Sequence, residues 1–148
     1  MTDDELRDFI AGSQTVILNS IHKDGVPHPM PMWFGVEGDG TIVMTTFRKS
    51  QKVANLRRDP RVSLLVEDGT VYGELRGAVI YGNAQLVDDT DRVLDILSEV
   101  STRNQPVDDA GRKTMRGVLA KTASKRIGIR VKPQRIVSWD HRKLSGVY

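Results

Sequence analysis

Residues 71–87 read VYGELRGAVIYGNAQLV, and this stretch indicates the fold. It is rich in β-branched and aromatic residues, as strands are. Gly73, Gly77 and Gly82 interrupt it, and such glycines let a strand bend or bulge where a barrel closes. We therefore expect one long, bent strand at residues 71–87, in a small β-barrel or sandwich.

Further strands are predicted on both sides of this stretch. The early ones are joined by tight turns at Lys23–Gly25 and Glu37–Gly40, which favours antiparallel hairpins over helical crossovers. With the long strand, the total is about seven, and the fold class is mainly β with a few helices. The other predicted strands are Thr15–Ile21, Val26–Val36, Thr41–Thr46, Arg61–Glu67, and Arg126–Lys132 and Gln134–Asp140 on either side of Pro133.

Short helices are predicted between the strands. Thr2 and Glu5 have the spacing of a capping box, and Ser50 is a good N-cap for a helix that Asp59-Pro60 ends. Asn104-Gln105-Pro106 is expected to break a later helix, and the tail from His141 is expected to be irregular. The predicted helices are Thr2–Gly12, Ser50–Arg58, Thr90–Val100 and Ala110–Ser124.

Composition limits the class of protein. The 148 residues are 39% hydrophobic and 28% charged, which is typical of one folded domain, here residues 1–148. Cysteine is absent, so disulfides and thiolate metal sites are excluded. The three histidines are too scattered to predict a metal site. No apolar run is long enough to cross a bilayer and no secretory signal is visible, so we expect a cytoplasmic protein without membrane contact.

Positive charge is concentrated in one segment. The net charge is +3, yet residues 48–61 alone hold six basic residues and one acid. This pattern predicts either one anionic partner at one place or a solvated basic helix face. Nucleic acid is not expected, because only 5% of the residues are aromatic and few bases could stack on the protein.

The same segment holds a candidate phosphate site. A predicted strand ends at Thr45 and Thr46, and a helix starts after Ser50. The first turn of a helix offers unpaired N–H groups and a positive dipole end, and Lys52 would add an ammonium there. Arg48 stands just before this turn. The alternative interpretation is a helix capped by Ser50 with a solvated basic turn.

Prolines mark one edge of the sheet. Pro27, Pro29 and Pro31 lie at alternate positions, so their missing N–H groups point to one side of the strand. That side cannot pair in a ladder, and we expect it to be a sheet edge or to face a ligand. Residues 71–87 also contain more apolar side chains than one face of a strand can bury. A two-fold dimer would cover both this apolar surface and the unpaired edge, and we therefore predict one.

The segment TFRKSQK (46–52) resembles the cofactor signature of the pyridoxamine 5′-phosphate oxidase-like split-barrel superfamily. Its continuation NLRRDPRV (55–62) resembles flavin/deazaflavin oxidoreductases of branch B, common in actinobacteria, many of which use coenzyme F420. The likeness extends to KDGVP (23–27), WF (33–34), ELRG (74–77) and WDHRKL (139–144). Two departures from the oxidases argue against oxidation of pyridoxamine phosphate as the activity. Gln51 stands where the oxidases have an arginine, and residues 26–32 contain no arginine where the oxidases have a second one that contributes to phosphate binding.

The resemblance implies a split β-barrel that forms a homodimer, with cofactor sites at the subunit interface. It implies F420 as cofactor and hydride transfer to an unsaturated small molecule, without a dedicated catalytic residue. The alternatives are an FMN enzyme of the same fold and a cofactor carrier without turnover. The implied cofactor-binding residues are Met30, Pro31, Met32 and Trp33 along the ring, Thr45, Thr46, Arg48, Ser50, Gln51 and Lys52 near the phosphate, and Arg57 and Trp139.

Overall fold

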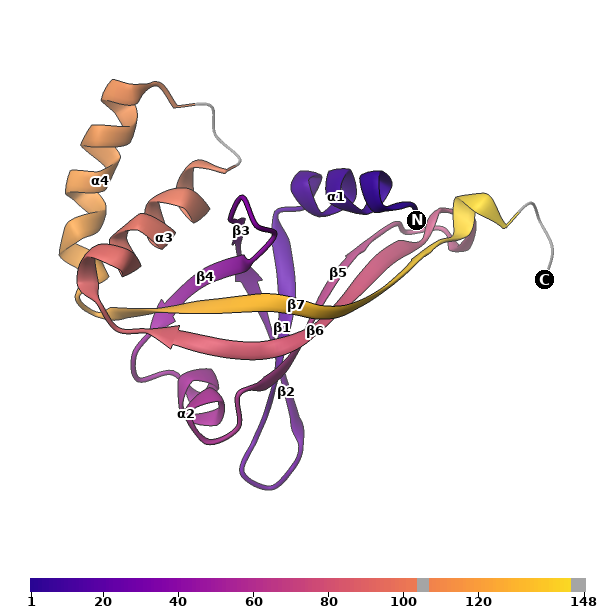
Figure 1. The fold of residues 1–148 in the computed structure, drawn as a ribbon, viewed down its shortest axis with the longest axis horizontal. Coiled ribbons are helices and arrows are strands. Elements are labelled where there is room, and N and C mark those ends of the chain that lie inside the picture. The colour runs from indigo at the N-terminus through magenta and orange to yellow at the C-terminus, as the bar shows by residue number, and fades with distance from the viewer. Residues whose placement is uncertain (104–106, 145–148) are drawn as a thin grey trace.

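The computed structural model describes residues 1–103 and 107–144, and within them it contains one antiparallel sheet and four α-helices (Figure 1). The predicted helix break at residues 104–106 and the end of the tail at 145–148 lie outside the described residues. The helices are α1 (Asp3–Gly12), α2 (Gln51–Arg58), α3 (Thr90–Thr102) and α4 (Asp109–Ala123). The strands are β1 (Thr15–Ile21), β2 (Pro27–Trp33), β3 (Gly35–Val36), β4 (Ile42–Phe47), β5 (Arg61–Asp68), β6 (Arg76–Val87) and β7 (Arg126–Asp140), with short 3-10 turns η1 (Tyr72–Glu74) and η2 (His141–Lys143).

The sheet curls into a barrel because two consecutive strands lie at its opposite ends. The strand order is β2-β1-β5-β6-β7-β4-β3, so the chain passes from one edge to the other between Trp33 and Gly35. Phe34, at this crossing, is 1% exposed and packs in the main core. The predicted strand 26–36 is therefore divided at Phe34. The expectation that the proline strand is an edge is confirmed, since β2 ends the sheet.

The barrel is split along β7. This strand pairs with β4 from Arg126 to Val131 and with β6 from Gly128 to Asp140. Beyond Val131, β7 pairs with β6 alone, and this β6–β7 ribbon, which β5 borders on the other side of β6, leaves the β3–β4 hairpin behind (Figure 1). The mainly β, split-barrel fold class is confirmed.

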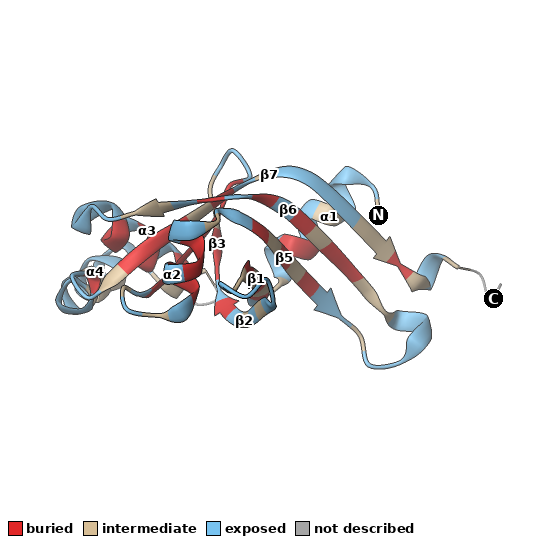
Figure 2. Cartoon of the chain, turned by 90° about the horizontal axis from the view of Figure 1, so that it is seen from below, coloured by how far each residue is buried: buried red, intermediate tan, exposed pale blue. Residues whose placement is uncertain are grey.

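The buried residues alternate along the strands, as Figure 2 shows for β5 and β6. Leu18, Met44, Leu64 and Ile80 fill the barrel and are fully buried. A second, smaller cluster joins α3 to the sheet through contacts of Val43 with Ile96 and Val100. The core thus fixes β4, which carries the candidate site, from both faces.

The long strand is shorter than predicted. It begins at Arg76, and residues 72–74 form η1 instead. Gly73 does not bend a strand, and a Cβ there would meet nothing within 4 Å. The bend at Gly82 is confirmed: the register between β6 and β7 shifts between Tyr81 and Gly82.

Residues 126–140 form one continuous strand, β7, and the prediction of two strands there was wrong. β7 runs through Pro133, which pairs with Gly82, while Arg135 pairs with Tyr81. Gln134 is thus the extra residue of a β-bulge, a place where a sheet tolerates proline. Because the bulge absorbs the proline, the strand bends there without ending.

Candidate functional site

The end of β4 and the start of α2 bring three polar side chains together. The Lys52 ammonium donates a hydrogen bond to Thr46 Oγ1 at 3.1 Å, and Thr46 Oγ1 lies 3.4 Å from Ser50 Oγ. Lys52 is only 8% exposed. Among the described residues, no carboxylate lies within 4.0 Å of its ammonium. We name Thr46, Ser50 and Lys52 the hydroxyl–lysine cradle.

The N-terminus of α2 belongs to this cradle. Ser50 occupies the N-cap position, as predicted, but its hydroxyl makes no capping hydrogen bond and turns to Thr46 instead. The first bond of the helix runs from Val53 N–H to the Ser50 carbonyl at 3.1 Å. The N–H groups of Gln51 and Lys52 precede it and lie at the positive end of the helix dipole. Hydroxyls, N–H groups and an ammonium therefore converge, a donor set that suits a phosphate.

The electrostatics of the cradle also favour an anionic ligand. Burial lowers the pKa of the Lys52 ammonium below its usual value of 10.5. A desolvated cation that contacts only a hydroxyl is unfavourable by itself, and an anion beside it relieves the cost. The residues present thus fit a phosphate group.

A buried amide holds α2 in place. Asn55 is 0% exposed, and its Nδ2 donates to Ser20 Oγ of β1 at 3.0 Å. Gln51 Nε2 donates to Asn55 Oδ1 at 2.9 Å, so this predicted site residue lies along the exposed surface of the helix. The sequence analysis missed Asn55 and Ser20, because only the tertiary fold brings α2 against β1.

The two threonines of β4 are separated. Successive side chains of a strand point to opposite faces. Thr46 is part of the cradle, whereas Thr45 Oγ1 accepts a hydrogen bond from Arg126 Nη1 at 3.4 Å. The Arg126 guanidinium also lies 4.7 Å from the centre of the Phe47 ring. The structure thus groups Thr45 with Arg126, a residue that the sequence analysis did not single out.

Much of the basic segment is neutralised inside the chain. Arg48 forms an ion pair with Asp88 and donates from Nε to the Ser124 carbonyl at 3.1 Å. Arg57 lies 4.0 Å from the same Asp88 carboxylate. Two further arginines are also engaged: Arg61 pairs with Asp59, and Arg58 donates to the Ile21 carbonyl. Lys49 is exposed and makes no salt bridge among the described residues.

The predicted ring-binding residues lie on β2, which contacts β4. Met32 is buried in the barrel core and Met30 is half-buried. Pro31 and Trp33 point outward, and Trp33 is 69% exposed.

Trp139 lies near the far end of β7, where it stacks against Gly77. It is eleven residues from Gly128, the partner of Thr45, or roughly 35 Å along the strand at about 3.3 Å per residue. Within one chain, Trp139 is therefore not part of the cradle.

The described residues contain no group of three or more His, Asp or Glu side chains placed to hold a metal ion. None of the helices in residues 1–103 and 107–144 combines the length and the apolar character that crossing a bilayer requires.

Comparison with known families identifies the class of protein. The family described as pyridoxamine 5′-phosphate oxidase matches residues 2–140, so the chain belongs to this family. The expected membership of the split-barrel superfamily is thereby confirmed.

Several solved structures are similar to this chain in fold. A conserved hypothetical protein from Mycobacterium tuberculosis is 40% identical, with a TM-score of 0.86 over 100% of this chain and 90% of that chain. An F420 reductase is 21% identical, with a TM-score of 0.65 over 88% of this chain and 94% of that chain. HutZ, the heme storage protein from Vibrio cholerae, is 14% identical, with a TM-score of 0.68 over 93% of each chain. The last two likenesses show the shared fold.

Proposed function

We propose that this protein is an oxidoreductase that binds coenzyme F420 and passes hydride to an unsaturated small molecule. The observation that carries the proposal is the buried Lys52 ammonium, whose hydrogen-bond partner is the Thr46 hydroxyl and not a carboxylate, with Ser50 Oγ on the other side of Thr46 Oγ1. A buried cation of this kind is suited to an anionic group of a ligand.

The roles of the residues follow from their positions. Thr46, Ser50, Lys52 and the first N–H groups of α2 hold the phosphate. β2 offers an unpaired edge and the exposed Trp33 for the ring. When bound, the cofactor supplies the hydride, and the protein supplies orientation and electrostatics. No protein residue is assigned as nucleophile or proton donor.

F420 is favoured over FMN by the likeness of residues 55–62 to deazaflavin-using proteins and by an F420 reductase among the structural relatives. F420 also carries a polyanionic tail. Lys49 is exposed beside the cradle, and the Arg48 N–H donates to the Lys125 carbonyl at 3.2 Å, which brings a second exposed lysine to the same loop. The paired Arg57 is a weaker candidate for this tail, because Asp88 competes for it. FMN is the second candidate, since the cradle suits its phosphate equally.

A homodimer completes the proposal. An apolar row crosses the outer face of five adjacent strands in register: Pro31, Ile17, Leu65, Val79 and Val137. Val137 is 47% exposed, and an apolar row of this kind is unfavourable in water. A two-fold contact would bury it and create two identical clefts beside β2. In such a dimer Trp139 could reach the cofactor only from the second copy.

The decisive experiment is binding followed by turnover. The purified protein is titrated separately with F420 and with FMN, and changes in absorbance give the two affinities. We expect F420 to bind more tightly. Tight FMN binding without F420 binding would select the FMN alternative. Reduced F420 is then mixed with enones, quinones and tetrapyrroles. F420 binding without oxidation by any of them would favour a carrier.

Sedimentation of the apo protein at low micromolar concentration tests the assembly, and a dimer is expected. Because the cofactor would bind the dimer, thermal stability should also rise with cofactor concentration. A clean monomer that binds cofactor at full affinity would show that the site is built within one chain.

A further inference from the structure

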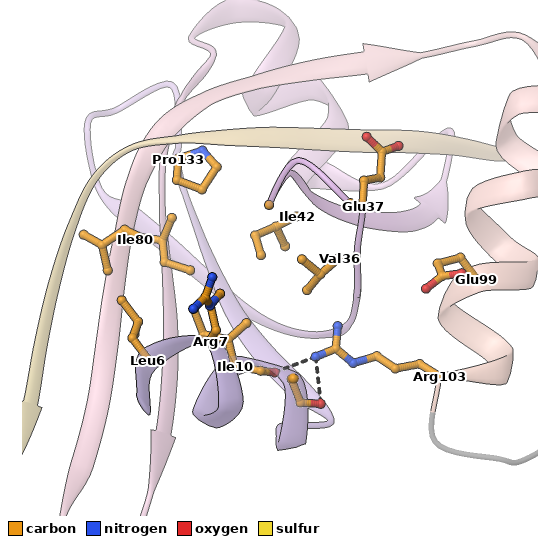
Figure 3. A pocket seen from close by; sticks show the side chains of 14 residues that line it. Leu6, Arg7, Ile10, Val36, Glu37, Ile42, Ile80, Glu99, Arg103 and Pro133 are labelled. Carbon is orange, nitrogen blue, oxygen red and sulfur yellow. Dashed lines mark hydrogen bonds between the residues drawn. The ribbon is translucent and has the colours of Figure 1, made fainter. Parts of the chain in front are cut away.

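A cavity of about 490 Å³ lies in the split of the barrel, and its lining shares no residue with the predicted cofactor site (Figure 3). It forms where β7 leaves β4 after Val131, so that Pro133 and Ile136 diverge from the β3–β4 hairpin. α1 and the end of α3 border the gap. The volume falls within the roughly 300–1,000 Å³ of small-molecule sites.

The walls of the cavity are mostly apolar. They come from four parts of the chain that are distant in sequence: α1, the β3–β4 hairpin, the middle of the β6–β7 ribbon and α3. The apolar side chains labelled around the space in Figure 3 are Leu6, Ile10, Val36, Ile42, Ile80 and Pro133, and Ile136 also lines the cavity. An occupant of this space therefore needs an apolar body.

One cation stands at the edge of this apolar space. The Arg103 guanidinium lies 4.1 Å from the centre of the Phe34 ring. Its Nη2 donates to the carbonyls of Ile10 and, at 3.2 Å, Ala11, at the C-terminal end of α1 (Figure 3). Its Nε is buried without a hydrogen-bond partner, and Nη1 makes no hydrogen bond with the described residues. Arg103 lines the cavity, and because Nε is covered by the protein, Nη1 is the unused donor that it offers there.

The other charged groups of the lining are mostly paired. Glu37 pairs with Arg130, and Arg7 pairs with Asp4. Glu99 is the remaining carboxylate, and it forms no salt bridge with a described residue. Burial lowers the pKa of the Arg103 guanidinium while the Glu99 charge raises it, and arginine remains a cation throughout. One cation and one nearby acid favour a ligand with a single negative charge over a dianion.

We propose that this cavity binds an apolar monocarboxylic acid, with its hydrocarbon part among the isoleucines and its carboxylate on Arg103. Guanidinium–carboxylate hydrogen bonds are charge-assisted and strong where water is excluded. Glu99 weakens this contact and sets an upper limit on affinity. The proposed site has no residue in common with the predicted cofactor site, so it does not rest on the proposed function.

Decanoate and decanol are the probes, titrated by isothermal calorimetry into the wild-type protein below micelle-forming concentrations. Decanoate should bind at least about tenfold more tightly than decanol, the margin of a charge-assisted hydrogen bond. Equal affinity of the two would overturn the assignment to a carboxylate. Absence of decanoate binding would overturn the site itself.

Variants locate the binding. Ala11→Trp fills the cavity from the exposed end of α1 and should abolish decanoate binding, whereas the matched Ala120→Trp on exposed α4 should leave it unchanged. Glu99→Gln should tighten binding several-fold. Arg103→Gln should weaken it about tenfold, with folding checked by thermal melting because Arg103 also caps α1. Full decanoate affinity in Ala11→Trp would show that the acid binds elsewhere.

Discussion

The two ends of the β6–β7 ribbon balance their charges in opposite ways. At the far end, the Asp140 carboxylate pairs with Arg142 and Asp68 pairs with Arg76. At the near end, beside the start of β7, Lys52 is buried, and within the described residues its ammonium bonds only to the Thr46 hydroxyl. The far end satisfies its charges within the chain. At the near end Arg48 is paired with Asp88, but the buried Lys52 has no carboxylate partner among the described residues, and our proposal assigns it to a ligand.

The pKa values express this difference. The side-chain hydrogen bond from Arg142 lowers the pKa of Asp140 to about 2, so folding and ionisation support each other there. Burial lowers the pKa of Lys52, so folding and ionisation oppose each other. The coupling between folding and ionisation thus has opposite signs at the two ends.

The largest expected effect is at the cradle. Lys52→Met should weaken cofactor binding roughly 10- to 150-fold, or about 1.5–3 kcal/mol, because it removes a charge-assisted hydrogen bond. The same change should stabilise the ligand-free protein by about 1 kcal/mol, since a desolvated charge is replaced by an apolar side chain. Cofactor titration and urea unfolding measure the two effects.

The exposed Lys49 provides the control. Lys49→Met should change binding far less and should not stabilise the protein. Since the pKa of Lys52 is lowered, the unfolded chain binds more protons just below pH 10.5, and wild-type stability should rise with pH there. Lys52→Met should lack this rise. Equal binding losses in both variants would mean that only the general positive charge matters.

At the far end, the next effect is on folding. A Cβ at Gly77 would overlap the Trp139 ring, so Gly77→Ala should lower the free energy of unfolding by about 1–3 kcal/mol. Urea denaturation measures the change. Gly73→Ala, whose Cβ would meet nothing within 4 Å, should be close to neutral. Trp139→Ala should rescue Gly77→Ala, and a failure to rescue would place the strain in the backbone.

A smaller effect distinguishes the two threonines. Thr46→Val removes the hydroxyl that accepts from Lys52 and should weaken cofactor binding by about 0.5–1.5 kcal/mol. Thr45→Val loses only the contact with Arg126 on the other face, and its cofactor affinity should equal that of the wild type. Equal losses in both variants would contradict the separation of the two side chains.

Local patterns predicted most of the fold. The capping box at Thr2 is present, β1 has the predicted bounds, and the bend at Gly82 is a real bulge. Pro133 misled the prediction, because a proline that would end an ordinary strand is accommodated by that bulge. Residues 72–74 were also assigned to a strand on their composition, although they form a 3-10 turn.

The site was only partly predictable. Ser50 and Lys52 come together within one helical turn, and local spacing was enough to group them. The alternation of strand residues already separates Thr45 from Thr46, but the sequence analysis grouped them with the same ligand. Asp88 could not have been foreseen as the partner of Arg48, because that pair spans forty residues and depends on the packing of α3 beside the loop.

The smallest expected effect is the acid dependence of the far end. Asp140 has a lowered pKa, so its ion pair is complete above about pH 4 and is lost as the pH falls toward 2. Asp140→Asn should therefore destabilise the protein at pH 6 and lose this disadvantage as the pH approaches 2. The effect is small because the side chain of Arg142 is 52% exposed and solvent screens the pair. Urea midpoints at pH 6, 4 and 3 measure it.

Arg142→Met should give the same pH dependence, and the double variant should add nothing further, since both changes remove one contact. An additive double variant would mean that Asp140 acts instead through its hydrogen bond from the Arg142 N–H, which keeps the end of β7 in register with η2.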